Sequence, residues 1–274
     1  MKQYFIIMMC IISPFISFSQ TVNEGVMAIL PDTNVSTVST FDNISSGVVV
    51  NNGNFYFYSN FINDGLYMYD SQEKGSLAVF QAYDQNTGKQ ELRGTVPSEF
   101  YDILFDNLTP NFAFDLKNDI SIGGIANFKE GIIRIDSLDG AMVFKKGAKA
   151  INVSDLSFAD GIVEKLGNES FEFPIGNKKI YRMAAISAPK YSSDRFFSRY
   201  HFANSNNRDN HSKKEAAIDI IDDKEYWIVE KEKNTQSNII LTLTWDERTT
   251  PEVLLKKAEK NLRILRWDDI EQMW

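Results

Sequence analysis

One short pattern recurs along the first part of this chain: an acidic residue, a glycine and two apolar residues. It occurs as DGLY at Asp64, EGII at Glu130, DGAM at Asp139 and DGIV at Asp160. Glycine permits the positive φ that a tight turn requires, and the apolar pair that follows begins a new strand. Repetition of one turn-and-strand unit is typical of a solenoid, in which each coil buries its face against its neighbours.

The segments between these turns are predicted to be short β-strands. Runs such as NFYFYSNF, YDILFDN and INVSDLSF are rich in β-branched and aromatic residues. Gly, Asn, Asp and Ser interrupt them at intervals of roughly 8 to 12 residues. We therefore predict an all-β protein in which residues 20–165 form a β-solenoid-like region, that is, a parallel β-helix. Because the spacing of the repeats is irregular, a fold of two β-sandwiches is the alternative.

The stretch NNGNFYFYSNFINDGLYMYD, residues 51–70, is unusually rich in aromatic side chains. Successive side chains of a strand point to opposite faces. Phe55 and Phe57 are therefore assigned to the core, and the tyrosines between them to the outer face. Tyrosines on an outer face suit stacking on sugar rings or on peptide. The candidate binding residues are Tyr56, Tyr58, Tyr67 and Tyr69.

Residues 1–19 have the layout of a secretory signal peptide. Lys2 precedes an apolar run from Tyr4 to about Ile16, and small residues follow at Ser17 and Ser19. The run is shorter than the roughly 20 residues of a bilayer span, so no transmembrane anchor is expected. We expect export to the cell surface or the extracellular space, with the periplasm as an alternative.

Cysteine content and charge exclude several classes of function. Cys10 is the only cysteine and lies in the predicted signal peptide, so the mature chain has no thiolate nucleophile and no Cys-based zinc site. The net charge of −8 argues against nucleic acid as a partner, because phosphate binding requires clustered Lys and Arg. No motif indicates a cofactor or a metal ion, and neither is expected.

Residues 166–274 are interpreted as a second, β-sandwich-like domain. Strands are expected at FFSRYHFANS, KEYWIVEKE and NIILTLTWDE, and one short helix at TTPEVLLKKAEKNL, with Thr249 as its N-cap. The final run RILRWDDIEQMW is expected to return to a strand. The chain stops there at Trp274, so we predict that the domain is incomplete at its C-terminus. Its open strand edge would favour self-association.

The second region also resembles a known kind of module. GIVEKLGNESFEFPIGNKKIYRMAAISAP, EYWIVEK, LTLTWDE and LRILRWDDIEQMW are similar to a module of exported Bacteroidota proteins, which often carry a gliding-motility-associated (type IX secretion) domain. The resemblance implies a surface or secreted protein with a repetitive β region before this module. Met183 departs from the proline usual after Tyr-Arg, and the secretion domain does not follow Trp274. Passage across the outer membrane is therefore an expectation from the resemblance alone.

The search for catalytic residues finds no complete constellation in the sequence. His201 lies in a predicted strand, and His211 has only Asp209 beside it as a further metal ligand. Neither a Gly-x-Ser-x-Gly elbow nor a His-Glu-x-x-His motif occurs. Paired carboxylates could hydrolyse glycosides, but the spacing selects no pair. The carboxylates considered are Asp115, Asp119, Asp219, Asp222 and Asp223.

These observations favour a non-enzymatic secreted or cell-surface protein, a structural or adhesin-type β-rich stem or interaction module. Its expected partners are glycans or other surface proteins. One alternative is a glycan-binding module that uses the exposed tyrosines. The other is a polysaccharide-active enzyme on a β-helix scaffold, because parallel β-helices include sugar-cleaving enzymes with acidic and basic residues on one face.

Overall fold

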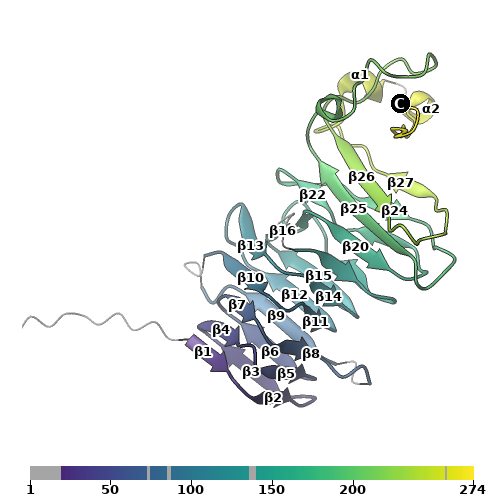
Figure 1. The fold of residues 1–274 in the computed structure, drawn as a ribbon. Helices are drawn as coiled ribbons and strands as arrows, with labels where there is room; N and C mark the ends of the chain where they lie inside the picture. Colours follow the sequence, from purple (N-terminus) through teal and green to yellow (C-terminus); the bar gives the residue numbers. More distant parts are fainter. Residues whose placement is uncertain (1–19, 73–74, 85–87, 136–139, 257) are drawn as a thin grey trace, which may run out of the picture.

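A computed structural model describes residues 20–72, 75–84, 88–135, 140–256 and 258–274. The chain forms a parallel β-solenoid that is followed by further β-sheets and a short helical segment (Figure 1). The predicted fold class is therefore confirmed. The predicted signal peptide, residues 1–19, lies outside the described residues. None of the helices in the described ranges is long and apolar enough to cross a membrane.

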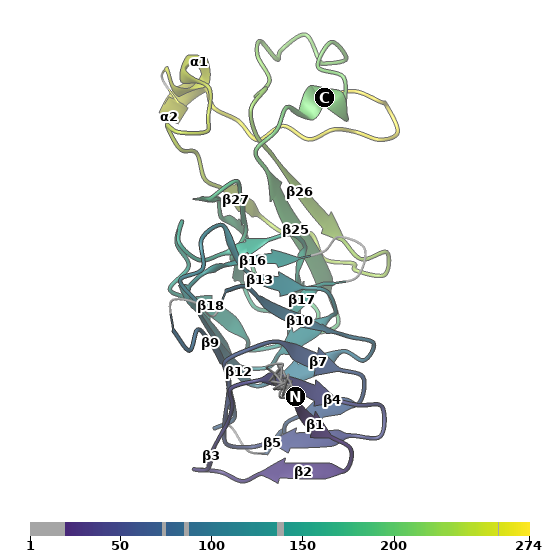
Figure 2. The same ribbon diagram turned by 90° about the vertical axis from the view of Figure 1, so that its left-hand side faces the viewer.

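Each of the first six coils of the solenoid contributes one strand to each of three faces, which are visible as stacked rows of arrows in Figure 2. The first face is a seven-stranded sheet in which all pairs are parallel. Its strands are β1 (Gln20–Asn23), β4 (Thr40–Asn43), β7 (Phe61–Asn63), β10 (Gln90–Gly94), β13 (Phe112–Leu116), β16 (Ile132–Ile135) and β19 (Ala159–Asp160).

The second face begins as a three-stranded parallel sheet and continues as a six-stranded sheet. The last two strands of the second sheet, β25 and β26, are antiparallel to their neighbours and belong to the C-terminal part of the chain. The strands of this face are β2 (Val26–Ile29), β5 (Val48–Asn51), β8 (Leu66–Met68), β11 (Ser98–Phe100), β14 (Ile120–Ile122), β17 (Met142–Phe144), β20 (Val163–Leu166), β25 (Arg195–His201) and β26 (Tyr226–Lys231).

The third face is a six-stranded parallel sheet, with one strand from each of six coils. Coils of this kind bury apolar side chains only when they stack, so each coil depends on its neighbours for its core. The strands of the third face are β3 (Asn34–Thr37), β6 (Asn54–Phe57), β9 (Leu77–Gln81), β12 (Asp102–Asp106), β15 (Ile125–Glu130) and β18 (Lys149–Ile151).

A row of phenylalanines runs through the interior along the third face. Phe57, Phe80, Phe105 and Phe128 occupy equivalent positions of four neighbouring strands. Their ring centroids are 4.8, 6.2 and 5.7 Å apart in that order. All four are fully buried, as the alternation of β6 predicted for Phe55 and Phe57. The core of the solenoid is therefore one continuous apolar column.

A second row consists of the asparagines that end the first three strands of the first face, β1, β4 and β7. The side-chain amide of Asn23 donates to Asn43 Oδ1 at 2.8 Å, and that of Asn43 donates to Asn63 Oδ1 at 2.7 Å. At the next coil the register places Gly94 beside Asn63. Gly94 has a φ of +138°, and a Cβ there would lie 2.1 Å from the backbone oxygen of Asn63. The row therefore stops, and Asn63 donates instead to Ser98 Oγ at 2.9 Å.

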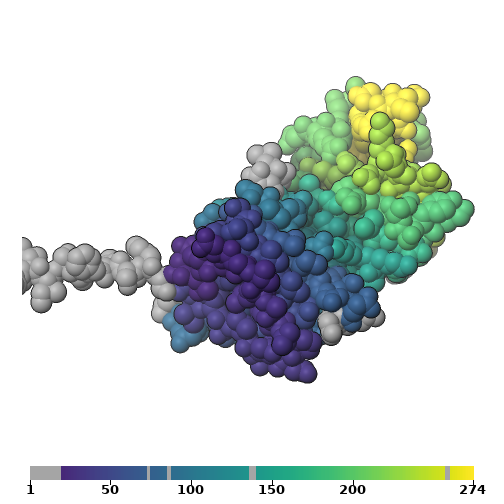
Figure 3. Space-filling view, turned by 60° about the horizontal axis from the view of Figure 1, so that its bottom comes forward, coloured from purple at the N-terminus to yellow at the C-terminus, as the bar shows by residue number. Residues whose placement is uncertain are grey.

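The remaining strands lie at the end of the solenoid opposite the first coil (Figure 3). Because β25 pairs with β20, the solenoid face continues into the C-terminal part, and the predicted boundary at residue 165 falls inside β20. The other strands here form one three-stranded sheet and one two-stranded sheet. They are β21 (Phe171–Phe173), β24 (Ala184–Ile186), β27 (Leu241–Leu243), β22 (Gly176–Asn177) and β23 (Ile180–Tyr181).

The helical segment lies where it was expected, although its start differs from the prediction. It consists of α1 (Glu252–Leu255) and α2 (Ala258–Asn261), and a 3₁₀ turn, η1 (Ser205–Asn207), lies elsewhere. Pro251 occupies the N-cap position without a side-chain hydrogen bond, so the prediction of Thr249 as the cap was wrong. Thr249 is fully buried two residues earlier, and its hydroxyl donates to the backbone oxygen of Asp246 at 3.5 Å.

The predicted strand near the chain end does not form. Residues 262–274 contain one isolated bridge, between Asp268 and Met273, and no strand. The backbone N–H of Trp274 donates to the oxygen of Lys213, and its indole N–H donates to the oxygen of Asp209 at 3.3 Å. Trp274 is thus held against the loop of residues 204–215, so it does not border an open strand edge.

Candidate binding site at the Tyr69–Tyr101 corner

The four tyrosines named from the sequence do not form one surface. Tyr56 and Tyr58 are half-buried on the outer side of the third face, and Tyr58 contacts Tyr83 edge-on at 5.6 Å. Tyr67 is 1% exposed, so its assignment to an exposed platform was wrong. Tyr67 is the middle residue of β8 and points inward, where its hydroxyl accepts a hydrogen bond from Asn51 at 3.2 Å. Burial raises the pKa of the Tyr67 phenol.

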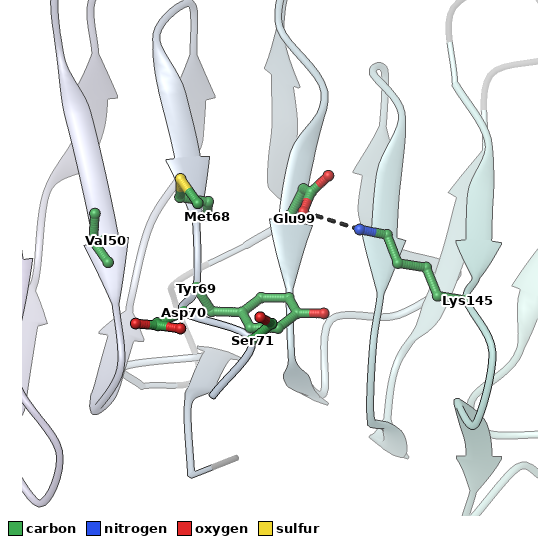
Figure 4. Close-up of a pocket in the computed structure, with 7 residues that line it drawn as sticks. All are labelled: Val50, Met68, Tyr69, Asp70, Ser71, Glu99 and Lys145. Atoms are coloured by element: carbon green, nitrogen blue, oxygen red, sulfur yellow. Dashed lines mark ion pairs between the residues drawn. The ribbon is translucent and has the colours of Figure 1, made fainter. Parts of the chain in front are cut away.

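Tyr69 follows β8 and borders an open hollow on the second face (Figure 4). The hollow has a cavity volume of about 480 Å³, within the range of small-ligand pockets. Its apolar side is formed by strand residues of β5 and β8, and its polar side by carboxylates, a hydroxyl and a lysine. The lining residues are Val50, Met68, Tyr69, Asp70, Ser71, Glu99 and Lys145.

A second hollow adjoins the first at the corner between the second and third faces. It has a cavity volume of about 490 Å³. The two hollows meet at a pair of rings, because Tyr69 and Tyr101 contact each other with centroids 5.4 Å apart at 62°. The lining residues of the second hollow are Tyr101, Asp102, Gly123, Gly124, Ile125, Lys146 and Gly147.

Two glycines at this corner have no side chains and so leave the space in which Tyr69 and Tyr101 lie. A Cβ on Gly123 would lie 2.1 Å from Tyr69 Oη. A Cβ on Gly124 would lie 2.3 Å from Asp102 Oδ1 and 3.1 Å from Cε1 of Tyr101. Contacts that close do not occur, so a side chain at either position would push the tyrosines or Asp102 aside. The Gly-Gly pair therefore forms the floor under both rings.

The corner is built from equivalent positions of successive coils. Tyr101 lies between β11 and β12, the glycine pair between β14 and β15, and the Lys145–Lys146 pair between β17 and β18. The coil made of β7, β8 and β9 has a longer turn than the coil before it. Eight residues separate β8 from β9, whereas two separate β5 from β6. The extra residues begin with Tyr69, Asp70 and Ser71, which border the first hollow. A longer turn in one coil thus supplies one wall.

Charges of both signs surround the rings. Glu99 and Lys145 form an ion pair at 2.9 Å across the first hollow, while Lys146 is exposed beside the second. Burial, assisted by the negative charge of Glu99, raises the pKa of the Tyr69 phenol. Desolvation raises the pKa of Asp102, although the N–H of Ile125 donates to its carboxylate and opposes that shift. The rim offers both donors and acceptors of hydrogen bonds.

A row of charged residues crosses the first face. If the protein were a polysaccharide-active enzyme on a β-helix scaffold, its acidic and basic catalytic residues would be expected in a row of this kind. Glu91, Asp115, Arg134 and Asp160 are in register on β10, β13, β16 and β19. The carboxylate of Asp115 is 2% exposed and forms ion pairs with Lys89 and with Arg134, the latter at 2.7 Å.

The outer carboxylates of this row are also engaged. Lys117 donates to Glu91 at 2.8 Å, and the amide of Asn177 donates to both oxygens of Asp160, at 3.0 and 3.1 Å. Burial raises the pKa of Asp160, while Asn177 and the positive charges of Arg199 and Arg134 oppose that shift. The carboxylates of this row are thus held by neighbouring side chains, an arrangement that strengthens the sheet and leaves Asp115 no access to a substrate.

Of the two histidines, His211 contacts a hydroxyl in the way that a nucleophilic pair would. Ser205 Oγ lies 2.8 Å from His211 Nε2, and the imidazole packs edge-on against Trp274. Ser205 is 2% exposed, so its hydroxyl is closed to substrates, and the pair holds the 204–215 loop together. His201 stacks on Tyr226 at 4.7 Å. Among the described residues no group of His, Cys, Asp and Glu could hold a metal ion.

The C-terminal part contains a buried ion pair that the sequence did not indicate. Arg182 and Glu225 are 2% and 1% exposed, and two N–H···O bonds of 3.0 and 2.9 Å join them. Arg182 also donates to Thr244, and Glu225 accepts hydrogen bonds from Tyr200 at 2.7 Å and Thr250 at 2.6 Å. Because these hydrogen bonds satisfy both charges inside the protein, the pair acts as a structural element.

Comparison of the chain with protein-family models, curated proteins and solved structures finds no match. The assignment of the site therefore depends on its geometry.

Several residues of the corner were absent from the sequence-based candidates. Glu99, Tyr101 and Lys145 carry no local signal, because they meet Tyr69 only after the coils have stacked. The glycine pair was visible in IGGIANF but was interpreted as an isolated pair within strands. The asparagine row had a clear signal, the 20-residue spacing of Asn23, Asn43 and Asn63.

Proposed function

We propose that this protein is a non-enzymatic, exported interaction module in which the solenoid acts as a rigid stem. The observation that carries the proposal is the uninterrupted stacking of coils. On the third face each strand pairs with the strand of the preceding and of the following coil, from β3 to β18. Such pairing fixes the distance between the two ends of the stack, which is the property a stem requires.

The interior supports the same proposal, because its side chains contact those of the next coil. The phenylalanine column and the asparagine row connect neighbouring coils through ring contacts and side-chain hydrogen bonds. Polar side chains inside a fold stabilise it when each has a partner. The charges on the first face are likewise engaged with each other. This use of carboxylates favours a structural role over catalysis.

Export is proposed from the apolar run between residues 4 and 16 and from the resemblance to surface proteins of the Bacteroidota. The test is mass spectrometry of protein produced with its natural N-terminus in a Gram-negative host. Cleavage near Ser19 or Gln20 is expected. Recovery of secreted or periplasmic protein that retains Cys10 would overturn this part of the proposal.

The stem is tested by lengthening it. Phe61 lies one coil above Phe41, so an additional copy of residues 41–60, inserted after Asn60, adds one coil in register. Three copies should lengthen the particle by about 14 Å, since parallel strands are about 4.8 Å apart. Small-angle X-ray scattering measures the maximum dimension. A folded protein of unchanged length would contradict the stem, and a matched insertion of 60 Gly/Ser residues, the length of the three copies, at the same point is the control.

The catalytic alternative is tested with the same protein. Incubation with a panel of neutral and acidic polysaccharides should release neither reducing ends nor unsaturated products above the buffer control. Product formation by the wild type would show that the non-enzymatic proposal is wrong, and its loss in Asp115→Asn with an unchanged circular dichroism spectrum would assign the activity to the charged row of the first face.

A further inference from the structure

We infer that the Tyr69–Tyr101 corner is a binding site for a neutral oligosaccharide. This inference deepens the proposed interaction function and rests on it. The corner combines two half-buried rings, a floor without side chains and a rim of hydrogen-bonding groups. Pyranose rings present apolar C–H faces and a periphery of hydroxyls, so they require these two kinds of contact side by side.

Tyr69 and Tyr101 cross at 62°, so their faces are inclined to one another and border two adjoining hollows. An aromatic side chain with two χ angles loses little conformational entropy when it binds, and here the glycine floor restrains Tyr69 before any ligand arrives. The two hollows together offer room for more than one sugar unit.

Charge around the hollows selects neutral sugars over anionic ones. Three carboxylates border the hollows, on Asp70, Glu99 and Asp102, against the two amino groups of Lys145 and Lys146. The amine of Lys145 already pairs with Glu99. An anionic polysaccharide would therefore meet a surplus of negative charge, whereas hydroxyl groups can donate to the carboxylates and accept from the lysines.

Tyr58 and Tyr83 form a second pair of tyrosines with almost the same spacing, 5.6 Å, on the third face. Neither residue lines the two hollows described here. Among the described residues, two tyrosine pairs are in ring contact on the solenoid, and of the two only Tyr69 and Tyr101 line the hollows with the glycine floor. The second pair is the matched control.

The test is isothermal titration calorimetry of the mature chain with hexasaccharides of the cello, malto, xylo, manno and chito series. Binding of at least one series is expected. Tyr69→Ala and Tyr101→Ala should each weaken it by about tenfold or more, the loss typical of a central aromatic contact. Tyr58→Ala should leave the affinity within twofold of the wild type, given the separate location of that pair.

Fold defects are separated from binding defects by two further variants. Glu99→Gln and Lys146→Ala change rim groups that are partly or fully exposed, so the melting temperature should stay constant while the affinity falls. The site is wrong if no neutral hexasaccharide binds, if only anionic polysaccharides bind, or if Tyr58→Ala weakens binding as much as Tyr69→Ala. Cleavage of a bound hexasaccharide is a different outcome, since it would overturn the non-enzymatic function and leave the binding site in place.

Discussion

The solenoid and the C-terminal part bury polar groups in different ways. In the solenoid an asparagine meets another asparagine from the equivalent position one coil away, as Asn43 and Asn63 do. In the C-terminal part Arg182 meets Glu225, 43 residues away, and Thr244, 62 residues away. A stacked repeat can reuse one interaction in successive coils, whereas the non-repeating sheets require a contact specific to each site.

This difference predicts where the protein is most sensitive to substitution. A repeat distributes its stability over many similar contacts between neighbouring coils. The C-terminal sheets contain one buried charged pair that no neighbouring contact repeats, and a buried charge that loses its partner is strongly destabilising. The predictions below test this comparison, beginning with the largest expected effect.

Arg182→Ala should have the largest effect. Removal of the guanidinium leaves the carboxylate of Glu225 buried without its counter-charge, which should cost about 5 kcal/mol, the upper end of the range for broken buried pairs. The C-terminal sheets should unfold separately at low urea concentration. Chemical denaturation followed by tryptophan fluorescence reports on them, because the four tryptophans lie at positions 227, 245, 267 and 274.

Arg248→Ala is the control for that experiment. Arg248 pairs with Asp246 at 2.6 Å and with Asp155, but its side chain is 53% exposed. Solvent screens exposed pairs, which contribute little to stability, so the unfolding midpoint should change little. Equal losses of stability in the two variants would show that the buried Arg182–Glu225 pair contributes no more than the exposed Arg248 pairs.

Phe57→Ala should have the second largest effect. The residue is fully buried and contacts Phe80 in the interior column. Truncation of a buried phenylalanine should cost roughly 4 kcal/mol through lost burial and the remaining cavity. Tyr56→Ala, one position along the same strand but half-buried, should cost clearly less. Thermal melts monitored by circular dichroism compare the two, and similar losses would mean that both sides of β6 are buried.

Asn43→Ala should have an intermediate effect. It leaves the amide of Asn23 and the carbonyl of Asn63 without their side-chain partner, and a buried unsatisfied group costs about 1–3 kcal/mol. Asn34→Ala is the matched control, because the Asn54–Asn34 contact is exposed. Urea denaturation should separate the two variants. A destabilisation by Asn34→Ala as large as that by Asn43→Ala would contradict a special role for the interior row.

The smallest expected effect is the contribution of His201, in the C-terminal part, to the pH dependence of stability. Burial, assisted by Arg199 and Arg208, lowers the pKa of His201 to about 4. Between that value and the ordinary value of 6.5 the unfolded chain binds more protons than the folded protein, so stability falls as the pH falls through this window. Unfolding at pH 7 and pH 4.5 should show the wild type losing more stability than His201→Gln. An equal loss would exclude His201 as the cause.

Some of the architecture was predictable from local sequence, and particular residues show why. Phe55 and Phe57 were correctly placed inside because the alternation of a strand is a property of the backbone alone. The same rule could not place Tyr67, whose strand is three residues long and follows a turn, so its register with respect to the core was not determined locally. The strand expected near Trp267 failed for a related reason, since the last residues pair with the loop at Lys213.

By itself, the sequence determined that the chain is an all-β protein and favoured a repeated coil over two β-sandwiches, because turn glycines and alternating apolar residues act over a few residues. Only the tertiary structure decided which side chains meet at the corner. Tyr69, Tyr101 and Gly123 lie 22 to 54 residues apart, and their juxtaposition depends on the length of every turn between them. The same holds for Arg182 and Glu225. Contacts of this kind depend on the geometry of all the strands and turns between the two residues, and no local sequence pattern predicts them.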